Sequence, residues 1–159
     1  MTFTREQPLS DDPRLTAMGL LVETYKGLWS MLAPQIKEHG MNETEFEVLL
    51  RLLRTPGHRL RMSDLADQTA LSTSGITRVI DRLERDELVE REICVNDRRG
   101  FWAALTAEGE RRISATIDGH AALVEEFFTG RLSETELDAL TAALRKVRDV
   151  VRPGAVAGV

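Results

Sequence analysis

The sequence has one cysteine, few lysines and no long apolar run. Because Cys94 has no second thiol to pair with, an intrachain disulfide and a thiolate-rich metal site are both excluded. No segment approaches the roughly 20 uncharged apolar residues of a membrane span, and the first residues contain no apolar core of signal-peptide length. We therefore expect a cytoplasmic protein with no membrane partner. We also expect Cys94 to be a buried and unreactive thiol.

The sequence motifs of the common enzyme classes are missing as well. The chain contains no G-x-S-x-G, no H-E-x-x-H, no phosphate-binding loop and no dinucleotide fingerprint. His39, His58 and His120 are far apart in the sequence and lack the spacing of metal ligands. We therefore expect neither catalysis nor a bound metal or other cofactor.

Positive charge is supplied mainly by arginine, since lysine occurs only at positions 26, 37 and 146. Arginine is well suited to bidentate contacts with carboxylates and phosphates. The formal net charge is −5, however, whereas nucleic-acid-binding proteins often have a basic excess. Net charge governs long-range attraction, but binding depends on where the positive groups lie. An acidic protein with a local basic edge is therefore still compatible with DNA binding.

The first part of the chain has the periodicity of helices. Apolar residues recur every three or four positions over residues 12–39, which predicts one long helix with a bend or break near Pro34. Asn42, followed three residues later by Glu45, has the pattern of a capping box and predicts a second helix that ends at PGHR. A short third helix is expected over residues 63–69. The apolar positions of the first helix are Leu15, Met18, Val22, Tyr25, Trp29, Leu32 and Ile36.

A fourth helix, capped by Ser72, has two distinct faces. Its buried face is expected to contain Ile76, Val79, Ile80 and Leu83, and its outward face Ser74, Arg78, Arg82 and Arg85, with Thr77 on the flank. Arg78 and Arg82 are one turn apart, and like charges at this spacing are unfavourable unless an anion lies against them. Both are therefore candidate DNA contacts. The alternative is a solvated face on which Asp81 and Asp86 pair with the later arginines.

A helix-turn-helix followed by a β-hairpin is predicted within residues 63–105. The third and fourth helices are joined through TALS, and in such a unit the second helix enters the major groove of DNA. Two strand-like runs flank VNDRRG and predict a hairpin with this sequence at its tip. No turn requires Arg98 and Arg99, so we expect them to project towards the adjacent minor groove. Asp97 is expected to hold one of these arginines in position.

Two more helices are predicted after the hairpin. The first begins at Thr106 and ends at Gly130, and the second opens with a capping box formed by Ser133 and Glu136. Their candidate buried positions are Ile113, Ile117, Leu123, Val124, Phe127 and Phe128 in the first, and Leu137, Leu140, Leu144, Val147 and Val151 in the second. The first and last helices have more apolar surface than the central unit can cover, which predicts a dimer interface. A closed monomeric bundle is the alternative.

The predicted fold is mainly α with one small β-hairpin wing. Residues 42–105 are expected to form a winged helix-turn-helix DNA-binding domain. Residues 1–41 and 106–152 are expected to form a helical dimerisation region. Residues 153–159 begin with a helix-stopping Pro-Gly pair and are expected to be a flexible tail.

The sequence resembles the MarR family of bacterial transcriptional regulators over nearly its whole length. LAPQIKEHGMNETEFEVLLRL resembles the end of the family's first helix and its second, LADQTALSTSGITRVIDRLERDELVER its helix-turn-helix, NDRRG its wing tip, and LTAEG the start of the next helix. The resemblance implies a homodimer that binds a pseudo-palindromic operator in double-stranded DNA. By motif position it implies major-groove contacts from Ser72, Thr73, Ser74, Thr77 and Arg78, a minor-groove contact from Arg99, and an arginine partner for Asp97. Arg98 fills the variable middle position of the wing motif.

The resemblance also implies that a small-molecule effector controls DNA binding. Many members of the family are released from DNA by small aromatic or phenolic acids that bind between the helical region and the winged lobe. Tyr25, Trp29 and Trp102 are candidate residues for such a site, although large aromatic residues at helical spacing more often belong to a core. We therefore expect a homodimeric, sequence-specific transcriptional regulator, a repressor released by such a ligand. The alternative is a winged-helix module that binds protein and not specific DNA.

Overall fold

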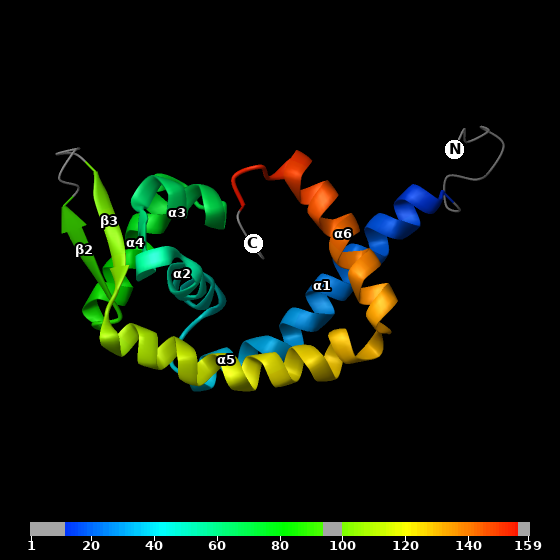
Figure 1. The fold of residues 1–159 in the computed structure, drawn as a ribbon, viewed down its shortest axis with the longest axis horizontal. Helices are drawn as coiled ribbons and strands as arrows, with labels where there is room; N and C mark the ends of the chain where they lie inside the picture. The colour runs from blue at the N-terminus through cyan, green and yellow to red at the C-terminus, as the bar shows by residue number, and fades with distance from the viewer. Residues whose placement is uncertain (1–11, 94–99, 156–159) are drawn as a thin grey trace.

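The computed structural model describes residues 12–93 and 100–155, and this part of the chain is mainly helical with one small sheet (Figure 1). The order of elements is α1 (Pro13–Glu38), α2 (Glu43–Arg54), β1 (Arg59–Arg61), α3 (Met62–Thr69), α4 (Thr73–Arg85), β2 (Val89–Ile93), β3 (Phe101–Leu105), α5 (Ala107–Phe127) and α6 (Glu134–Val151). Short 3-10 turns lie at Pro56–His58 and Thr129–Arg131. The predicted fold class is confirmed. Cys94, Asp97, Arg98 and Arg99 lie outside the described residues.

Helix α1 begins with a side-chain cap and continues through a proline. The carboxylate of Asp12 accepts a hydrogen bond from the backbone N–H of Arg14 at 2.9 Å, which supplies one of the partners that a helix start lacks. Of the predicted bend or break near Pro34, the break is wrong, because the helix continues to Glu38. Leu32 and Ile36 on either side of Pro34 are buried in the core, and such packing supplies most of the stability of a helix in a protein.

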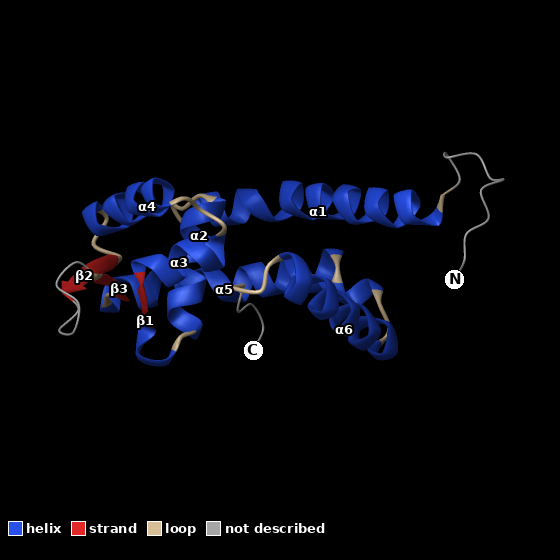
Figure 2. Ribbon diagram, turned by 90° about the horizontal axis from the view of Figure 1, so that it is seen from above, coloured by secondary structure: helices blue, strands red, loops and turns tan. Residues whose placement is uncertain are grey.

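The outer part of α1 extends away from α2 to α4, and α6 starts beyond the end of α5 and runs back towards α3 (Figures 1 and 2). Leu15, Met18, Leu20 and Tyr25 of α1 are all more than half exposed. No residue of α6 is buried, so its predicted apolar positions are exposed or only partly covered within one chain. Among the described residues, no helix has the length and apolarity needed to cross a membrane.

The winged lobe, formed by α2 to β3 and the start of α5, contains the hydrophobic core. The predicted capping box at the start of α2 is confirmed: Asn42 accepts a hydrogen bond from the N–H of Glu45 at 3.0 Å, and Glu45 accepts one from the N–H of Asn42 at 2.9 Å. The predicted short third helix is confirmed as α3. The side chains that are fully buried here include Leu49, Leu52, Leu65, Ile76, Ile80, Leu83, Leu88 and Ile113.

The sheet contains a strand that the sequence did not predict. The strand order is β1-β3-β2, and β1 pairs with β3 in antiparallel register, with Arg61 opposite Trp102. Strand β1 has three residues, and only Leu60 is buried. A run this short shows no alternation that a period-two search would recognise. The predicted hairpin strands are confirmed as β2 and β3.

Helix α5 connects the wing to α6 and lies along α1 (Figure 1). Its predicted cap is confirmed, since the hydroxyl of Thr106 accepts a hydrogen bond from the N–H of Gly109 at 2.9 Å. A Cβ at Gly109 would lie 2.0 Å from the backbone oxygen of Leu88, so this close approach requires glycine. The helix ends at Phe127 and not at Gly130. Of its candidate buried positions, only Ile113 is fully buried; Ile117, Leu123, Val124, Phe127 and Phe128 are partly covered.

The chain returns to the winged lobe after α6. The guanidinium of Arg152 donates to the backbone oxygens of Asp67 and Gln68, at 2.8 and 3.2 Å, near the end of α3. Ala155 is buried. Residues 153–155 of the predicted flexible tail are therefore held against α3, and residues 156–159 lie outside the described residues.

Candidate nucleic-acid interface

Helices α3 and α4 form the predicted helix-turn-helix. Helix α3 ends at Thr69 and is followed by Ala70, which adopts a left-handed conformation with φ of 56°. The N–H of Leu71 donates to the backbone oxygen of Ala66 at 3.0 Å. Ser72 then begins α4 by accepting a hydrogen bond from the N–H of Gly75 at 3.1 Å. Alanine thus takes the left-handed position at the end of a helix that glycine occupies more often.

The two faces of α4 are those that the sequence predicted. Its buried residues are Ile76, Val79, Ile80 and Leu83. Its exposed residues include Thr73, Ser74, Thr77, Arg78, Arg82 and Arg85. The apolar face packs into the lobe, so the hydroxyls and arginines of the opposite face are available to a partner.

The hydroxyl groups at the start of α4 are held by local hydrogen bonds. The oxygens of Ser72 and Ser74 are 3.1 Å apart. The hydroxyl of Thr77 donates to the backbone oxygen of Thr73 at 2.8 Å. The hydroxyl of Ser72 therefore has a structural role as the helix cap, and those of Thr73 and Ser74 lie on the exposed first turn.

The arginines of α4 differ in their partners. Arg82 forms an ion pair with Glu45 of α2 at 3.0 Å, which ties α4 to the capping box of α2. Arg85 donates to the backbone oxygen of Asp81 at 3.3 Å. The expected alternative, in which Asp81 and Asp86 pair with these two arginines, is not what the structure shows. The side chain of Arg78 has no hydrogen bond or ion pair within residues 12–93 and 100–155.

Strand β2 is held beside α4 by Arg91, an arginine whose side chain is partly buried. Arg91 forms ion pairs with Glu84 and, at 2.6 Å, with Asp81, and its N–H donates to Glu84 at 3.1 Å. These contacts hold the base of the hairpin against α4. The wing residues Asp97, Arg98 and Arg99 lie in the segment between β2 and β3 that the structure does not describe, so their contacts stay a prediction.

The aromatic residues predicted to line an effector site do not come together. Tyr25 is 60% exposed and meets Trp29 edge to face, with ring centroids 6.2 Å apart. Trp102 lies on β3 in the wing sheet, where the guanidinium groups of Arg59 and Arg61 stack on its ring. Trp102 packs with the side chains of β1, the strand that the sequence did not predict. The assignment of the three aromatic residues to an effector site stays a prediction.

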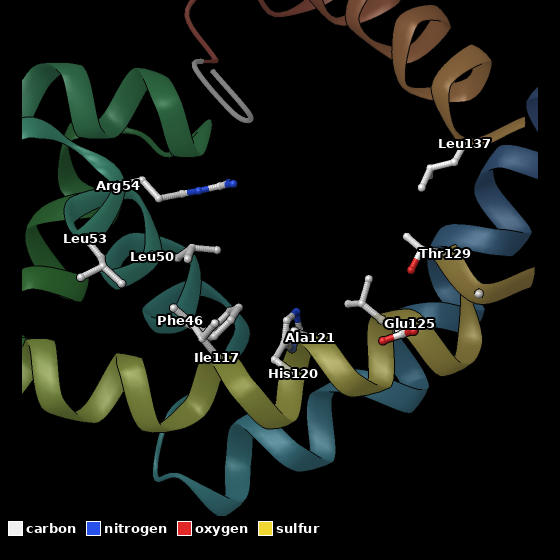
Figure 3. Close-up of a pocket in the computed structure, with 12 residues that line it drawn as sticks. Phe46, Leu50, Leu53, Arg54, Ile117, His120, Ala121, Glu125, Thr129 and Leu137 are labelled. Atoms are coloured by element: carbon white, nitrogen blue, oxygen red, sulfur yellow. The ribbon is translucent and has the colours of Figure 1, made fainter. Parts of the chain in front are cut away.

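A different cavity lies between α2 and α5, with one wall from the start of α6 (Figure 3). It has a volume of about 770 Å³ and is lined by apolar side chains together with Arg54, His120 and Glu125. The ring of His120 lies 4.6 Å from that of Phe46, centroid to centroid. Burial lowers the pKa of His120 below its usual value, and its buried Nδ1 has no hydrogen-bond partner. In Figure 3 the side chain of Arg54 extends from α2 towards the open part of this cavity.

The histidines do not form a metal site in the part of the chain that the structure describes. Within residues 12–93 and 100–155, no group of three or more histidine, cysteine, aspartate or glutamate side chains is arranged to hold a metal ion. His39, His58 and His120 lie on different elements, after α1, before β1 and within α5. His58 lies 3.7 Å from the carboxylate of Glu110.

The sequence and the structure were compared with known proteins. The sequence model of the family described as "MarR family" matches residues 41–101. The HTH-type transcriptional regulator MhqR of Bacillus subtilis (strain 168) is 33% identical over 128 residues, which cover 80% of this chain and 86% of MhqR.

Two crystal structures from Streptomyces coelicolor are similar over 94% of this chain. AbsC, a MarR family transcriptional regulator, matches with a TM-score of 0.84 at 32% identity, over 99% of its own chain. Sco3205, a MarR family transcriptional regulator in complex with DNA, matches with a TM-score of 0.83 at 28% identity, over 94% of its own chain. The relatives and the winged helix-turn-helix geometry agree, and the chain belongs to the MarR family of winged-helix transcriptional regulators.

Proposed function

We propose that this protein is a homodimeric repressor that binds a pseudo-palindromic DNA operator and is released by a small aromatic or phenolic ligand. The observation that carries the proposal is the outward face of α4, where exposed hydroxyls lie beside the exposed Arg78. That guanidinium has no partner within the described residues. Two like charges one turn apart, at Arg78 and Arg82, favour an anionic partner.

In this proposal α4 enters the major groove with its first turns against the bases. Thr73, Ser74 and Thr77 offer short polar groups to base edges or phosphates, and Arg78 is placed for a bidentate contact with a guanine. Arg82, already paired with Glu45, orients α4 and adds positive charge near the backbone. Arg98 and Arg99 of the wing are assigned to the adjacent minor groove, with Asp97 holding an arginine in place.

Dimerisation is supported by the exposed apolar side chains of α1 and α6. Leu20 and Tyr25 of α1 and Val147 and Val151 of α6 are each more than half exposed in the single chain. Exposed apolar surface of this extent is typical of an interface. A two-fold symmetric dimer places two copies of α4 about 34–36 Å apart, one turn of the duplex, which suits an operator of two half-sites.

Release by a ligand is supported by the cavity between α2 and α5. The cavity joins the winged lobe to the helices of the proposed dimer interface, so a bound molecule changes how the two regions are spaced. Its apolar lining suits an aromatic ring, and Arg54 supplies a positive charge for a carboxylate. Neutral His120, with a free Nδ1, can accept a hydrogen bond from a phenol.

The test is a binding assay on the DNA upstream of the protein's own gene, carried out over a series of salt concentrations. We expect Arg78→Ala to weaken operator binding by about fivefold or more, because a bidentate contact with a base contributes about 1–3 kcal/mol. Arg99→Ala should also weaken it, because it removes a guanidinium from the negative potential of the minor groove. Arg111→Ala is the matched control, since it removes the same charge from α5, where Arg111 pairs with Glu108. If no duplex is bound specifically, the alternative of a protein-binding winged helix is favoured.

The ligand part has its own test. A panel of benzoic and phenolic acids is screened for an increase in Tm, because a compound that binds the folded state stabilises it by mass action. An active compound should release the operator. Leu50→Trp, which fills the cavity, should abolish both effects without weakening DNA binding, and an unchanged response in this variant would contradict the assignment of the site.

A further inference from the structure

A second cleft lies between the wing strands and α4. It has a volume of about 670 Å³. One wall is formed by Thr73 and Thr77 of α4, and the other by Phe101 at the start of β3. Arg61, at the end of β1, and Ser63, at the start of α3, also line it. None of these elements belongs to the cavity between α2 and α5.

The guanidinium of Arg61 is held over an aromatic ring. Arg59 and Arg61 lie on the same face of β1, since Leu60 between them is buried. Their guanidinium carbons lie 5.3 and 5.4 Å from the centroid of the Trp102 ring, within the range of a cation–π contact. Trp102 therefore restricts both side chains in the same way.

The two arginines differ in whether a carboxylate neutralises them. Arg59 forms an ion pair with Glu92 at 2.9 Å and does not line the cleft. Arg61 lines the cleft and has no hydrogen bond or ion pair within the described ranges 12–93 and 100–155. An oriented guanidinium without a carboxylate partner is free to bind an external anion.

The other charged residues that line the cleft pair with each other. Asp81 and Arg91 form an ion pair at 2.6 Å. Arg91 also pairs with Glu84, which does not line the cleft. Among the described lining residues, Arg61 is therefore the charged side chain without an ion-pair partner.

We propose that Arg61 binds a phosphate of the DNA backbone in this cleft and that Trp102 is its positioning residue. This inference rests on the proposed function. A duplex with α4 in its major groove and the wing in the next minor groove has one strand of backbone between the two, and that strand must pass over the space between α4 and β3. Arg61 lies in this space and contacts phosphate, not bases, so it contributes affinity and register but no sequence preference.

The test compares Arg61→Ala with Arg59→Ala, which removes the same charge from the same face of the same strand. Operator and random duplexes are titrated with the full-length protein over a salt series. Arg61→Ala should make the slope of log affinity against log salt less steep by about two, because each dimer loses two phosphate contacts. It should weaken the two duplexes by equal factors, and Arg59→Ala should leave the slope unchanged. Arg61→Lys, which keeps the charge, should retain the slope of the unmodified protein.

The role of Trp102 is tested by a double-mutant cycle. Trp102→Leu should weaken operator binding in the unmodified protein but have no further effect in the Arg61→Ala background, since the contact it supports is already lost. Trp102→Phe, which keeps an aromatic face, should bind like the unmodified protein. An equal effect of Trp102→Leu in both backgrounds would overturn the positioning role.

The outcomes separate this inference from the proposed function. If the unmodified protein binds its operator and Arg61→Ala shows the same salt slope, the phosphate contact is overturned and the repressor proposal stands. If Arg61→Ala loses discrimination between operator and random DNA, Arg61 reads bases and the inference is again overturned. If the unmodified protein binds no DNA specifically, both proposals fail together.

Discussion

The winged lobe and the outer helices both have apolar residues at helical spacing but bury them to different extents. In the lobe, Leu49, Ile76 and Ile80 are completely buried. In α1, Leu20 is 59% exposed, and in α6 no residue is buried. Periodicity therefore identifies which face of a helix is apolar, but it does not identify whether the same chain covers that face. The lobe has its own core, whereas the outer helices have apolar side chains that the single chain leaves exposed.

The largest expected effect on stability comes from the core of the lobe. Ile80→Ala should lower the free energy of unfolding by about 2–5 kcal/mol, because it leaves a cavity among fully buried side chains. The effect should be the same at every protein concentration, since Ile80 packs within one chain. Denaturant titrations at two concentrations measure this. A loss below about 1 kcal/mol would mean that the lobe is less tightly packed than its burial indicates.

The apolar face of α6 should affect assembly and not the fold of the lobe. Leu144→Asp combined with Val147→Asp places two charges on the exposed apolar face and should convert the proposed dimer to monomer, as measured by light scattering. Ala142→Asp, on the opposite side of the helix, is the matched control and should leave the mass unchanged. If the unmodified protein is itself monomeric, or the double variant stays dimeric, the proposed interface is wrong.

The two capping boxes allow a direct comparison between the regions. Asn42 caps α2 inside the lobe, and Ser133 caps α6 at the surface. Asn42→Ala should lower the free energy of unfolding by about 1–2 kcal/mol, since α2 unfolds only with the core. Ser133→Ala should mainly fray the first turn of α6. Hydrogen exchange of individual amides distinguishes a global from a local loss, and equal global losses would contradict the comparison.

The smallest predicted effect lies at His120, where the two regions meet. Because burial lowers its pKa in the folded protein, the unfolded chain binds this proton at a higher pH. Its contribution to stability should therefore be present above the usual histidine pKa of about 6.5 and be lost as the pH falls towards the lower folded value. His120→Phe should reduce the fall in Tm between pH 7.5 and pH 5.5. A fall as large as that of the unmodified protein would mean that other groups cause it.

The features predictable from the sequence are those set by neighbouring residues. Asn42, Ser72, Thr106 and Ser133 were predicted as helix starts, and all four cap helices. The buried and exposed faces of α4 were predicted for the same reason, because a 100° rotation per residue fixes them locally.

The features that the sequence did not predict depend on distant contacts. The short strand β1 exists through its pairing with β3, some 40 positions later. Trp102 packs against β1, and this contact could not be predicted without that strand. The cavity near His120 is formed by helices far apart in the chain, and the pairing of Arg82 with Glu45 joins α4 to α2. No local sequence pattern encodes such contacts. The hairpin tip with Arg98 and Arg99 lies outside the described residues and stays a prediction.

The most direct test of the account is a hydroxyl-radical footprint of the protein on its operator. If two copies of α4 bind one side of a duplex, two protected segments should appear with centres about 34–36 Å apart, one helical turn. Both should weaken together in Arg78→Ala and remain in Arg111→Ala. A single protected segment, or uniform protection without sequence preference, would contradict the claim that paired recognition helices read the DNA.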